Sequence, residues 1–194
     1  MSTSLLATEQ SNPLRGGMRT QRSAPPCTMV IFGASGDLTS RKLMPALFSL
    51  ARAHRLAPTF SVIGVSLDEW SSEEFRATMR QAMVEFAGLE GDRMQEWESF
   101  ASRMHFISGK FDNPEVYQQL AALLKTLPGT SGNVLFYLAT PPSLFSVIVG
   151  QIGQAGRLGR QGRGGQQLGE RLLGNIARGQ LHRVATGGGK FEQG

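Results

Sequence analysis

The residues best suited to chemistry lie in VIFGASGDLTSRKLMPALF, residues 30–48. An apolar run ends at Phe32, and Gly33, Ser35, Gly36 and Asp37 occupy four of the next five positions. Glycine lacks a Cβ, so it allows positive φ angles and lets backbone N–H groups approach an anion closely. The N–H groups and the dipole at the start of a following helix also favour negative charge. The turn is therefore predicted to hold phosphate, although a G-x-x-G pattern alone also fits a tight turn without a ligand.

Two polar side chains of the turn have open roles. Ser35 could donate its hydroxyl hydrogen to a phosphate oxygen. Asp37 would repel a phosphate, so we expect it to cap the next helix or to bind cofactor hydroxyls. The three histidines, His54, His105 and His182, are expected to be structural or solvated. We therefore predict no catalytic residue and no metal site.

Strands and helices alternate along the part of the chain that would position this turn. Strands are predicted at 28–32, 59–65, 104–107 and 134–139, and helices at 40–53, 71–86, 94–100, 113–127 and from 144 onward. This alternation predicts an α/β fold, a Rossmann-like doubly wound parallel sheet that is incomplete and has disordered termini. In such a sheet the first strand-to-helix turn is the usual phosphate site. A sheet of only four strands would also leave an apolar edge and one helix face exposed.

Composition divides the chain into three parts. Residues 1–27 are rich in Ser, Thr, Pro, Arg and Gly and are expected to be a disordered leader. Residues 28–149 are the predicted domain. Residues 150–194 form a Gly/Arg/Gln-rich tail that is expected to be disordered or non-native, and the whole net charge of +5 lies there. The domain itself is electrically balanced, which argues against a nucleic-acid surface.

The bulk features exclude several classes of protein. No apolar run approaches the length of a membrane helix, so no membrane partner is expected. The single cysteine, Cys27, excludes an internal disulfide framework and is compatible with a reducing, cytoplasmic location.

The longer string FGASGDLTSRKLMPALF resembles the coenzyme-binding block of glucose-6-phosphate dehydrogenases. The resemblance continues through VIGVSLDEWSSEEFR, SGKFDNPEVYQQL and NVLFYLATPPSLF, and it covers about residues 28–149. It implies the NADP-binding domain of an oxidoreductase of the pentose phosphate pathway. The complete family enzyme oxidises glucose 6-phosphate to 6-phosphogluconolactone.

The resemblance also implies which residues bind the cofactor. Those that would line the pyrophosphate and adenosine are Gly33, Ala34, Ser35, Gly36, Asp37, Leu38, Thr39 and Ser40. Lys42 matches a family lysine near the cofactor and sugar phosphate, but it also fits a solvated cation on the first helix.

Three positions depart from the family pattern. Thr39 replaces the usual alanine, and Lys110 stands where the family often has an aspartate. Leu67 replaces an arginine that pairs with the 2′-phosphate of NADP, and the neighbouring Asp68 would repel that phosphate. We therefore expect a weakened preference for NADP, with NAD as a possible cofactor.

After residue 150 the sequence stops following the family. The Glu-Lys-Pro-Phe-Gly and His-Tyr-Leu-Gly-Lys motifs do not occur in it, which a frame shift or a truncation with an added linker would explain. We therefore expect the chain to be inactive alone, with glucose 6-phosphate bound only in the intact enzyme. The family is homo-oligomeric, but this fragment lacks the C-terminal domain. The alternatives are a non-catalytic NAD(P)-binding module and RNA binding through GRQGRGG in the tail.

Overall fold

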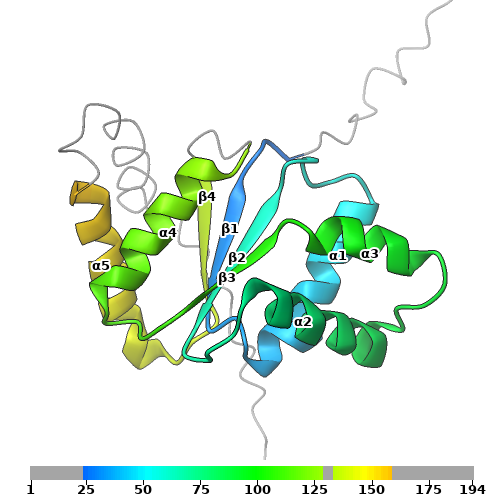
Figure 1. Ribbon diagram of the computed structural model, residues 1–194, viewed down its shortest axis with the longest axis horizontal. Helices are drawn as coiled ribbons and strands as arrows, with labels where there is room; N and C mark the ends of the chain where they lie inside the picture. Colours follow the sequence, from blue (N-terminus) through cyan, green and yellow to red (C-terminus); the bar gives the residue numbers. More distant parts are fainter. Residues whose placement is uncertain (1–23, 129–132, 159–194) are drawn as a thin grey trace, which may run out of the picture.

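The computed structural model describes residues 24–128 and 133–158 (Figure 1). Four strands form one parallel sheet in the order β3-β2-β1-β4. They are β1 (Thr28–Phe32), β2 (Ser61–Ser66), β3 (Met104–Ser108) and β4 (Val134–Leu138). The predicted parallel α/β sheet is confirmed, with β2 beginning two residues later than expected.

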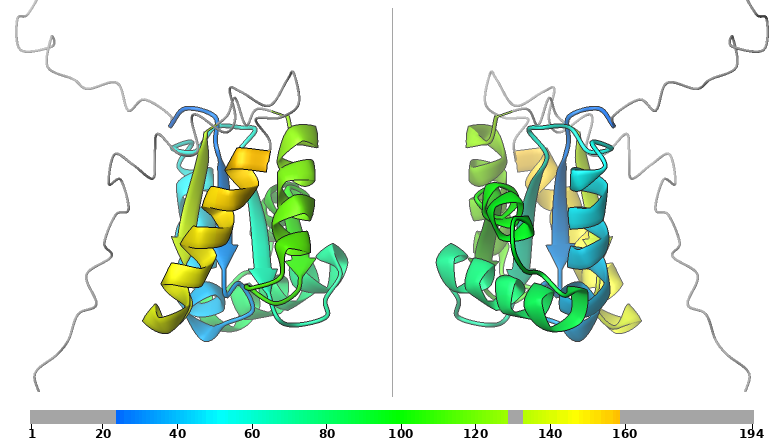
Figure 2. Two further views of the ribbon diagram at one scale, coloured as in Figure 1. Left: turned by 90° about the vertical axis from the view of Figure 1, so that its left-hand side faces the viewer. Right: turned by 90° about the vertical axis from the view of Figure 1, so that its right-hand side faces the viewer.

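Helices cover both faces of the sheet, as a doubly wound fold requires (Figures 1 and 2). One face carries α1 (Met44–Arg52), α2 (Ser72–Ala87) and α3 (Arg93–Ala101). The other face carries α4 (Pro114–Thr126) and α5 (Phe145–Leu158). Alternate residues of β1 point to opposite faces, so Ile31 joins the first core and Phe32 the second.

The core on the side of α4 and α5 contains a buried hydrogen bond. The Tyr117 ring stacks on Phe32, with ring centroids 5.9 Å apart. Its hydroxyl donates to the carbonyl oxygen of Phe111 across 2.6 Å. Burial, with the nearby charge of Asp112 as the smaller cause, raises the pKa of Tyr117 to about 12. The hydroxyl therefore stays protonated and keeps this donor role at neutral pH.

Two predicted helix starts are confirmed. The Ser71 hydroxyl accepts from the Glu74 amide, and the Glu74 carboxylate accepts from the Ser71 amide, which completes a capping box before α2. The Asn113 side chain accepts from the Glu115 amide at the start of α4. Both caps satisfy amides that have no partner within the helix.

The first helix differs from the prediction at its start. Residues Thr39–Leu43 form a π-helical turn, and α1 begins only at Met44, whereas the sequence predicted one helix over 40–53. The Met44 amide reaches back to the Thr39 carbonyl. Pro45 has no N–H to donate and lies in the first turn of α1. The π-helical turn therefore connects the glycine turn to the first turn of α1, where Pro45 lies.

The expected domain boundary at residue 150 lies inside α5, which continues to Leu158. Ile148 and Ile152 are buried against α4, and Ala155 is half-buried in the same core. This spacing places all three on one helix face, so burial outweighs the helix-weakening effect of Gly150 and Gly153. The folded domain therefore extends at least to residue 158. The remaining tail, like leader residues 1–23, lies outside the described residues.

β4 lies at one edge of the sheet that the described residues form. Leu135 is 46% exposed there, and Phe145 and Val147 of α5 are also exposed. The expected exposure of an apolar edge and helix face is thus confirmed for the described part of the chain. Within that part, no helix is both long and apolar enough to cross a membrane.

Gly150→Ala should stabilise the domain by roughly 1 kcal/mol, because alanine is the better helix former. A Cβ at this position would meet open space. Urea unfolding followed by circular dichroism would measure the gain. Gly64→Ala is the contrasting variant, because its Cβ would lie 2.8 Å from the Ala34 methyl and should destabilise the domain. Loss of stability in Gly150→Ala would contradict the helical assignment.

Tyr117→Phe should cost about 1–2 kcal/mol of unfolding free energy, because the Phe111 carbonyl would lose its buried donor. The raised pKa also predicts a pH effect. Tyr117 contributes its stabilisation fully below the unfolded-state pKa of 10 and loses it as pH rises toward about 12. Unfolding of both proteins between pH 8 and pH 12, a range chosen to span the two pKa values, should show the difference narrowing at high pH. A constant difference would exclude this coupling.

Candidate functional site

The glycine turn lies at the carboxyl end of β1, between the ends of β2 and β4. Gly33 has a φ angle of +82° and donates its amide to the Val65 carbonyl across 2.8 Å. A Cβ on Gly33 would lie 2.7 Å from the Ala139 carbonyl oxygen. Glycine is therefore required here both for the backbone conformation and for the close approach of β4.

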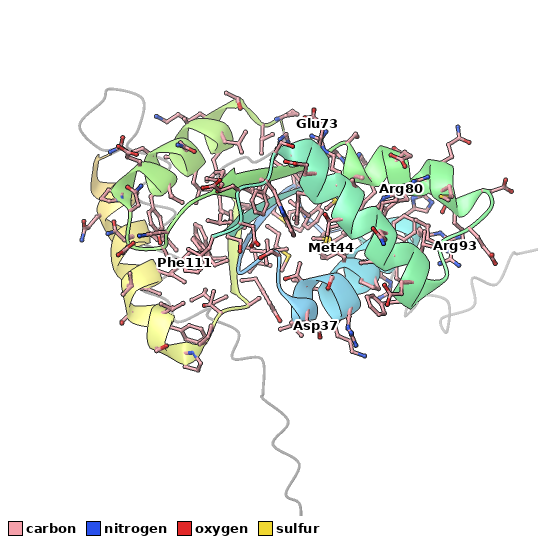
Figure 3. The ribbon with its side chains drawn as sticks, turned by 60° about the horizontal axis from the view of Figure 1, so that its bottom comes forward. Asp37, Met44, Glu73, Arg80, Arg93 and Phe111 are labelled. Atoms are coloured by element: carbon pink, nitrogen blue, oxygen red, sulfur yellow. The ribbon has the colours of Figure 1, made fainter. Side chains whose placement is uncertain are left out.

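Several amides of the turn remain available to a ligand. Gly36 donates to the Gly33 carbonyl at 3.1 Å, and the amides of Thr39 and Ser40 both donate to the Gly36 carbonyl. The amides of Ser35, Asp37 and Leu38 donate to no backbone oxygen in the described part of the chain. Three free amides at the start of a helix are an anion-binding arrangement. Asp37 marks this helix start in Figure 3.

Ala34 and Thr39 support the turn from the side of the hydrophobic core. Both are fully buried, and the Ala34 methyl packs into the core over Gly64. The Thr39 hydroxyl donates to the Gly33 carbonyl at 3.4 Å. Their side chains therefore face away from any ligand outside the turn, and only their backbone can line it. The threonine in place of the family alanine adds this hydrogen bond.

The charged residues of the first helix pair with one another. Asp37 forms an ion pair with Arg41 at 2.5 Å, and the Arg41 guanidinium lies 4.5 Å above the centre of the Phe86 ring. Asp37 was expected to cap the helix or to bind cofactor hydroxyls, and in the structure it pairs with an arginine one turn later. Lys42 is exposed and forms no ion pair with a described residue. Leu38 is also exposed.

A chain of hydrogen bonds joins the turn to the end of β2. The hydroxyls of Ser35 and Ser66 are 2.6 Å apart, and the Ser66 hydroxyl donates to Asp68 Oδ2 across 3.1 Å. A carboxylate only accepts, so the Ser66 hydroxyl donates its one proton to Asp68. The Ser35 hydroxyl must then donate to Ser66. The sequence suggested that Ser35 donates to a phosphate. In this arrangement its hydroxyl instead presents a lone pair on the ligand side.

Two further residues were missed by sequence reasoning. Ser66 is buried at the carboxyl end of β2, where a polar residue closing an apolar strand is a usable signal. Thr140 follows β4, and its Oγ1 is buried without a hydrogen-bond partner in the described part of the chain. Its methyl lies beside Gly33, within 3.1 Å of where a Cβ would be. A buried hydroxyl left unpaired next to the turn could bond to a ligand there.

The ends of β2 and β3 also meet at this site. Leu67 is 60% exposed, and Asp68 and Glu69 are exposed beside it. The Gly109 amide donates to the Ser66 carbonyl across 2.8 Å, which brings the exposed Lys110 next to the end of β2.

The two histidines among the described residues lie in separate segments of the chain. His105 is half-buried in β3, where burial and then the charge of Arg76 lower its pKa. His54 follows α1 with a positive φ angle, and His182 lies outside the described residues. Residues 24–128 and 133–158 contain no group of His, Cys, Asp or Glu that could hold a metal.

Comparison with known proteins agrees with this geometry. The model of the family "Glucose-6-phosphate dehydrogenase, NAD binding domain" matches residues 30–168. The chain belongs to this family. The family match continues beyond residue 149, in agreement with the longer α5. A nicotinamide dinucleotide is therefore the class of cofactor to which this domain is adapted.

Individual relatives support the same assignment. Glucose-6-phosphate 1-dehydrogenase of Chlamydia pneumoniae is 45% identical over 137 residues, which are 69% of this chain and 27% of the relative. Glucose-6-phosphate 1-dehydrogenase 2 of Mycobacterium bovis is 41% identical over 146 residues, which are 73% of this chain and 28% of the relative. The chain thus spans just over a quarter of the length of these dehydrogenases.

Solved dehydrogenase structures share the fold. A glucose-6-phosphate dehydrogenase in complex with glucose 6-phosphate superposes with a TM-score of 0.59 at 30% identity, over 68% of this chain and 28% of that one. The enzyme from Mycobacterium avium gives a TM-score of 0.58 at 30% identity, over 68% of this chain and 27% of that one.

Gly33→Ala should cost this dehydrogenase domain more stability than Gly88→Ala. Both glycines have positive φ angles, so alanine strains the backbone at either site by about 1–2 kcal/mol. Only at Gly33 does the new Cβ also collide with a carbonyl oxygen, because Gly88 faces open space. Urea unfolding of the two variants would measure this difference. Equal losses would show that β4 does not press on the turn.

Proposed function

We propose that this chain is a dinucleotide-binding domain of a glucose-6-phosphate dehydrogenase and that its glycine turn holds the cofactor diphosphate. The observation that carries the proposal is the set of three free amides, on Ser35, Asp37 and Leu38, at the start of the first helix. A diphosphate would accept from these amides and gain from the helix dipole. Membership of the NAD-binding domain family supports a dinucleotide over a simple anion.

The cofactor-binding residues expected from the sequence take different parts in this proposal. Gly33 and Gly36 shape the turn, and Ala34 and Thr39 hold it in place from the core side. Ser40 caps the turn's own carbonyls, with its hydroxyl 3.1 Å from the Asp37 carbonyl oxygen. Lys42 would act only as a mobile surface cation near the phosphates, because it is exposed.

Thr140 adds a buried hydroxyl near the turn that has no partner in the described part of the chain. The residue follows β4, and its methyl group lies beside Gly33. A buried donor without a partner costs free energy, and a cofactor oxygen bound there would remove that cost. This hydroxyl favours a ligand that extends from the helix start toward β4, as a dinucleotide does.

We further propose that the chain binds cofactor without oxidising sugar phosphate by itself. Hydride transfer from a sugar requires a general base, and the two described histidines are a half-buried strand residue, His105, and a residue just after α1, His54. The sugar-binding motifs of the family are also missing from the sequence. The chain would thus contribute cofactor binding, while glucose 6-phosphate would be bound and oxidised only in an intact enzyme.

Titration calorimetry of the full 194-residue chain tests the first part of the proposal. Binding of NAD or NADP is expected, and Gly36→Asp should weaken it about tenfold or more by placing a carboxylate at the diphosphate site. Gly150→Asp is the matched control, because it adds the same charge at an exposed position of α5 where a Cβ meets open space. Equal affinity in both variants, or no binding by the folded wild type, would exclude the glycine turn as the site.

A dehydrogenase assay tests the second part. The chain, mixed with glucose 6-phosphate and each dinucleotide, should form no reduced nicotinamide above a protein-free blank. The fold should be verified by circular dichroism in the same buffer. Cofactor reduction that depends on the protein would show that a catalytic base is present after all.

A further inference from the structure

We propose that the Asp68 carboxylate accepts a hydrogen bond from the adenosine ribose of the bound dinucleotide and that the chain therefore prefers NAD to NADP. This inference rests on the proposed function, because it concerns the same cofactor site. It assigns a specificity-determining role to the hydrogen-bonded chain Ser35–Ser66–Asp68, which is called the serine relay below.

The serine relay connects the two places where a dinucleotide's diphosphate and ribose must lie. Ser35 belongs to the glycine turn after β1, and Asp68 follows the neighbouring strand β2. The Gly33 amide also donates to the Val65 carbonyl, so the turn and the end of β2 are in direct contact. In doubly wound folds the ribose next to a diphosphate at this turn reaches the end of the second strand.

The hydrogen bond from Ser66 holds the Asp68 carboxylate in position. Ser66 is 5% exposed, so its hydroxyl has little freedom, and it donates to Asp68 Oδ2 at 3.1 Å. Asp68 itself is exposed, so its other oxygen can accept a hydrogen bond from a ligand. A ribose 2′-hydroxyl is a donor and fits this oxygen, whereas a 2′-phosphate offers only negative charge.

The side chains next to Asp68 also disfavour a 2′-phosphate. Glu69 adds a second carboxylate, and the exposed Leu67 side chain offers no donor to a phosphate. Arg41 of the first helix is already paired with Asp37. Lys110, after β3, is a cation that the topology brings to the end of β2, since the Gly109 amide bonds to the Ser66 carbonyl. The variant Lys110→Ala would show its effect on a 2′-phosphate.

The test is titration calorimetry of the full chain with NAD and with NADP. The wild type should bind NAD about tenfold more tightly than NADP. Asp68→Ala should weaken NAD binding about tenfold, the usual effect of losing one hydrogen bond to a charged group, and should leave NADP binding unchanged or tighter. Leu67→Arg combined with Asp68→Ser should reverse the preference.

Glu69→Ala is the matched control, because it removes the same charge one residue away and lies outside the serine relay. It should change the ratio of the two affinities less than Asp68→Ala does. Ser66→Ala should weaken NAD binding severalfold by freeing the carboxylate, with no change in the far-ultraviolet circular dichroism. Lys110→Ala should leave the preference for NAD in place.

Each contrary result has a distinct meaning. If both dinucleotides bind but NADP binds more tightly, or if Asp68→Ala and Glu69→Ala act alike, this inference fails while the proposed function stands. A large loss of NADP affinity in Lys110→Ala, with NADP the preferred cofactor, would assign the 2′ position to Lys110 instead. If the folded chain binds neither dinucleotide, the proposed function fails and this inference fails with it.

Discussion

The structure depends on how closely the backbone segments meet at the carboxyl end of β1. The chain turns there at Gly33 with a φ angle of +82°. Its amide is bonded to Val65 of β2, and a Cβ on Gly33 would lie only 2.7 Å from the carbonyl oxygen of Ala139 beyond β4. No side chain fits between these segments. Because the turn is held from both neighbouring strands, the helix that follows starts in a fixed direction, and the free amides of Ser35, Asp37 and Leu38 are oriented before any ligand binds.

The core beneath the turn maintains this geometry. Ala34 and Gly64 are in contact because neither carries a larger side chain, and Thr39 is buried so that its hydroxyl bonds to the Gly33 carbonyl. The π-helical turn Thr39–Leu43 then brings the chain to Pro45. Wide turns of this kind often occur at functional sites. A site made mostly of backbone amides depends on packing below it more than on the chemistry of its own side chains.

In the proposed site the serine relay would supply the selectivity. The turn would provide general affinity for a diphosphate, because amides and a helix dipole do not distinguish one dinucleotide from another. Discrimination would then come from the group beside the ribose, where this chain has Leu67 and Asp68. The proposal thus places affinity and selectivity on adjacent strands, whose ends are linked by two serine hydroxyls.

The sequence alone determined the fold class, the four strands, the caps at Ser71 and Asn113 and the position of the glycine turn. These features follow from local periodicity, from capping residues and from the conformations open to glycine. The pairing of Asp37 with Arg41 is likewise local, since the two residues are one helical turn apart. Two other features were decided by tertiary contacts. Burial of Ile152 on α4 extends α5 through two glycines, and Ser66 at the end of β2 takes up the Ser35 hydroxyl. Each contact joins residues far apart in the sequence, because which side chain or proton partner is nearest depends on how the folded chain packs.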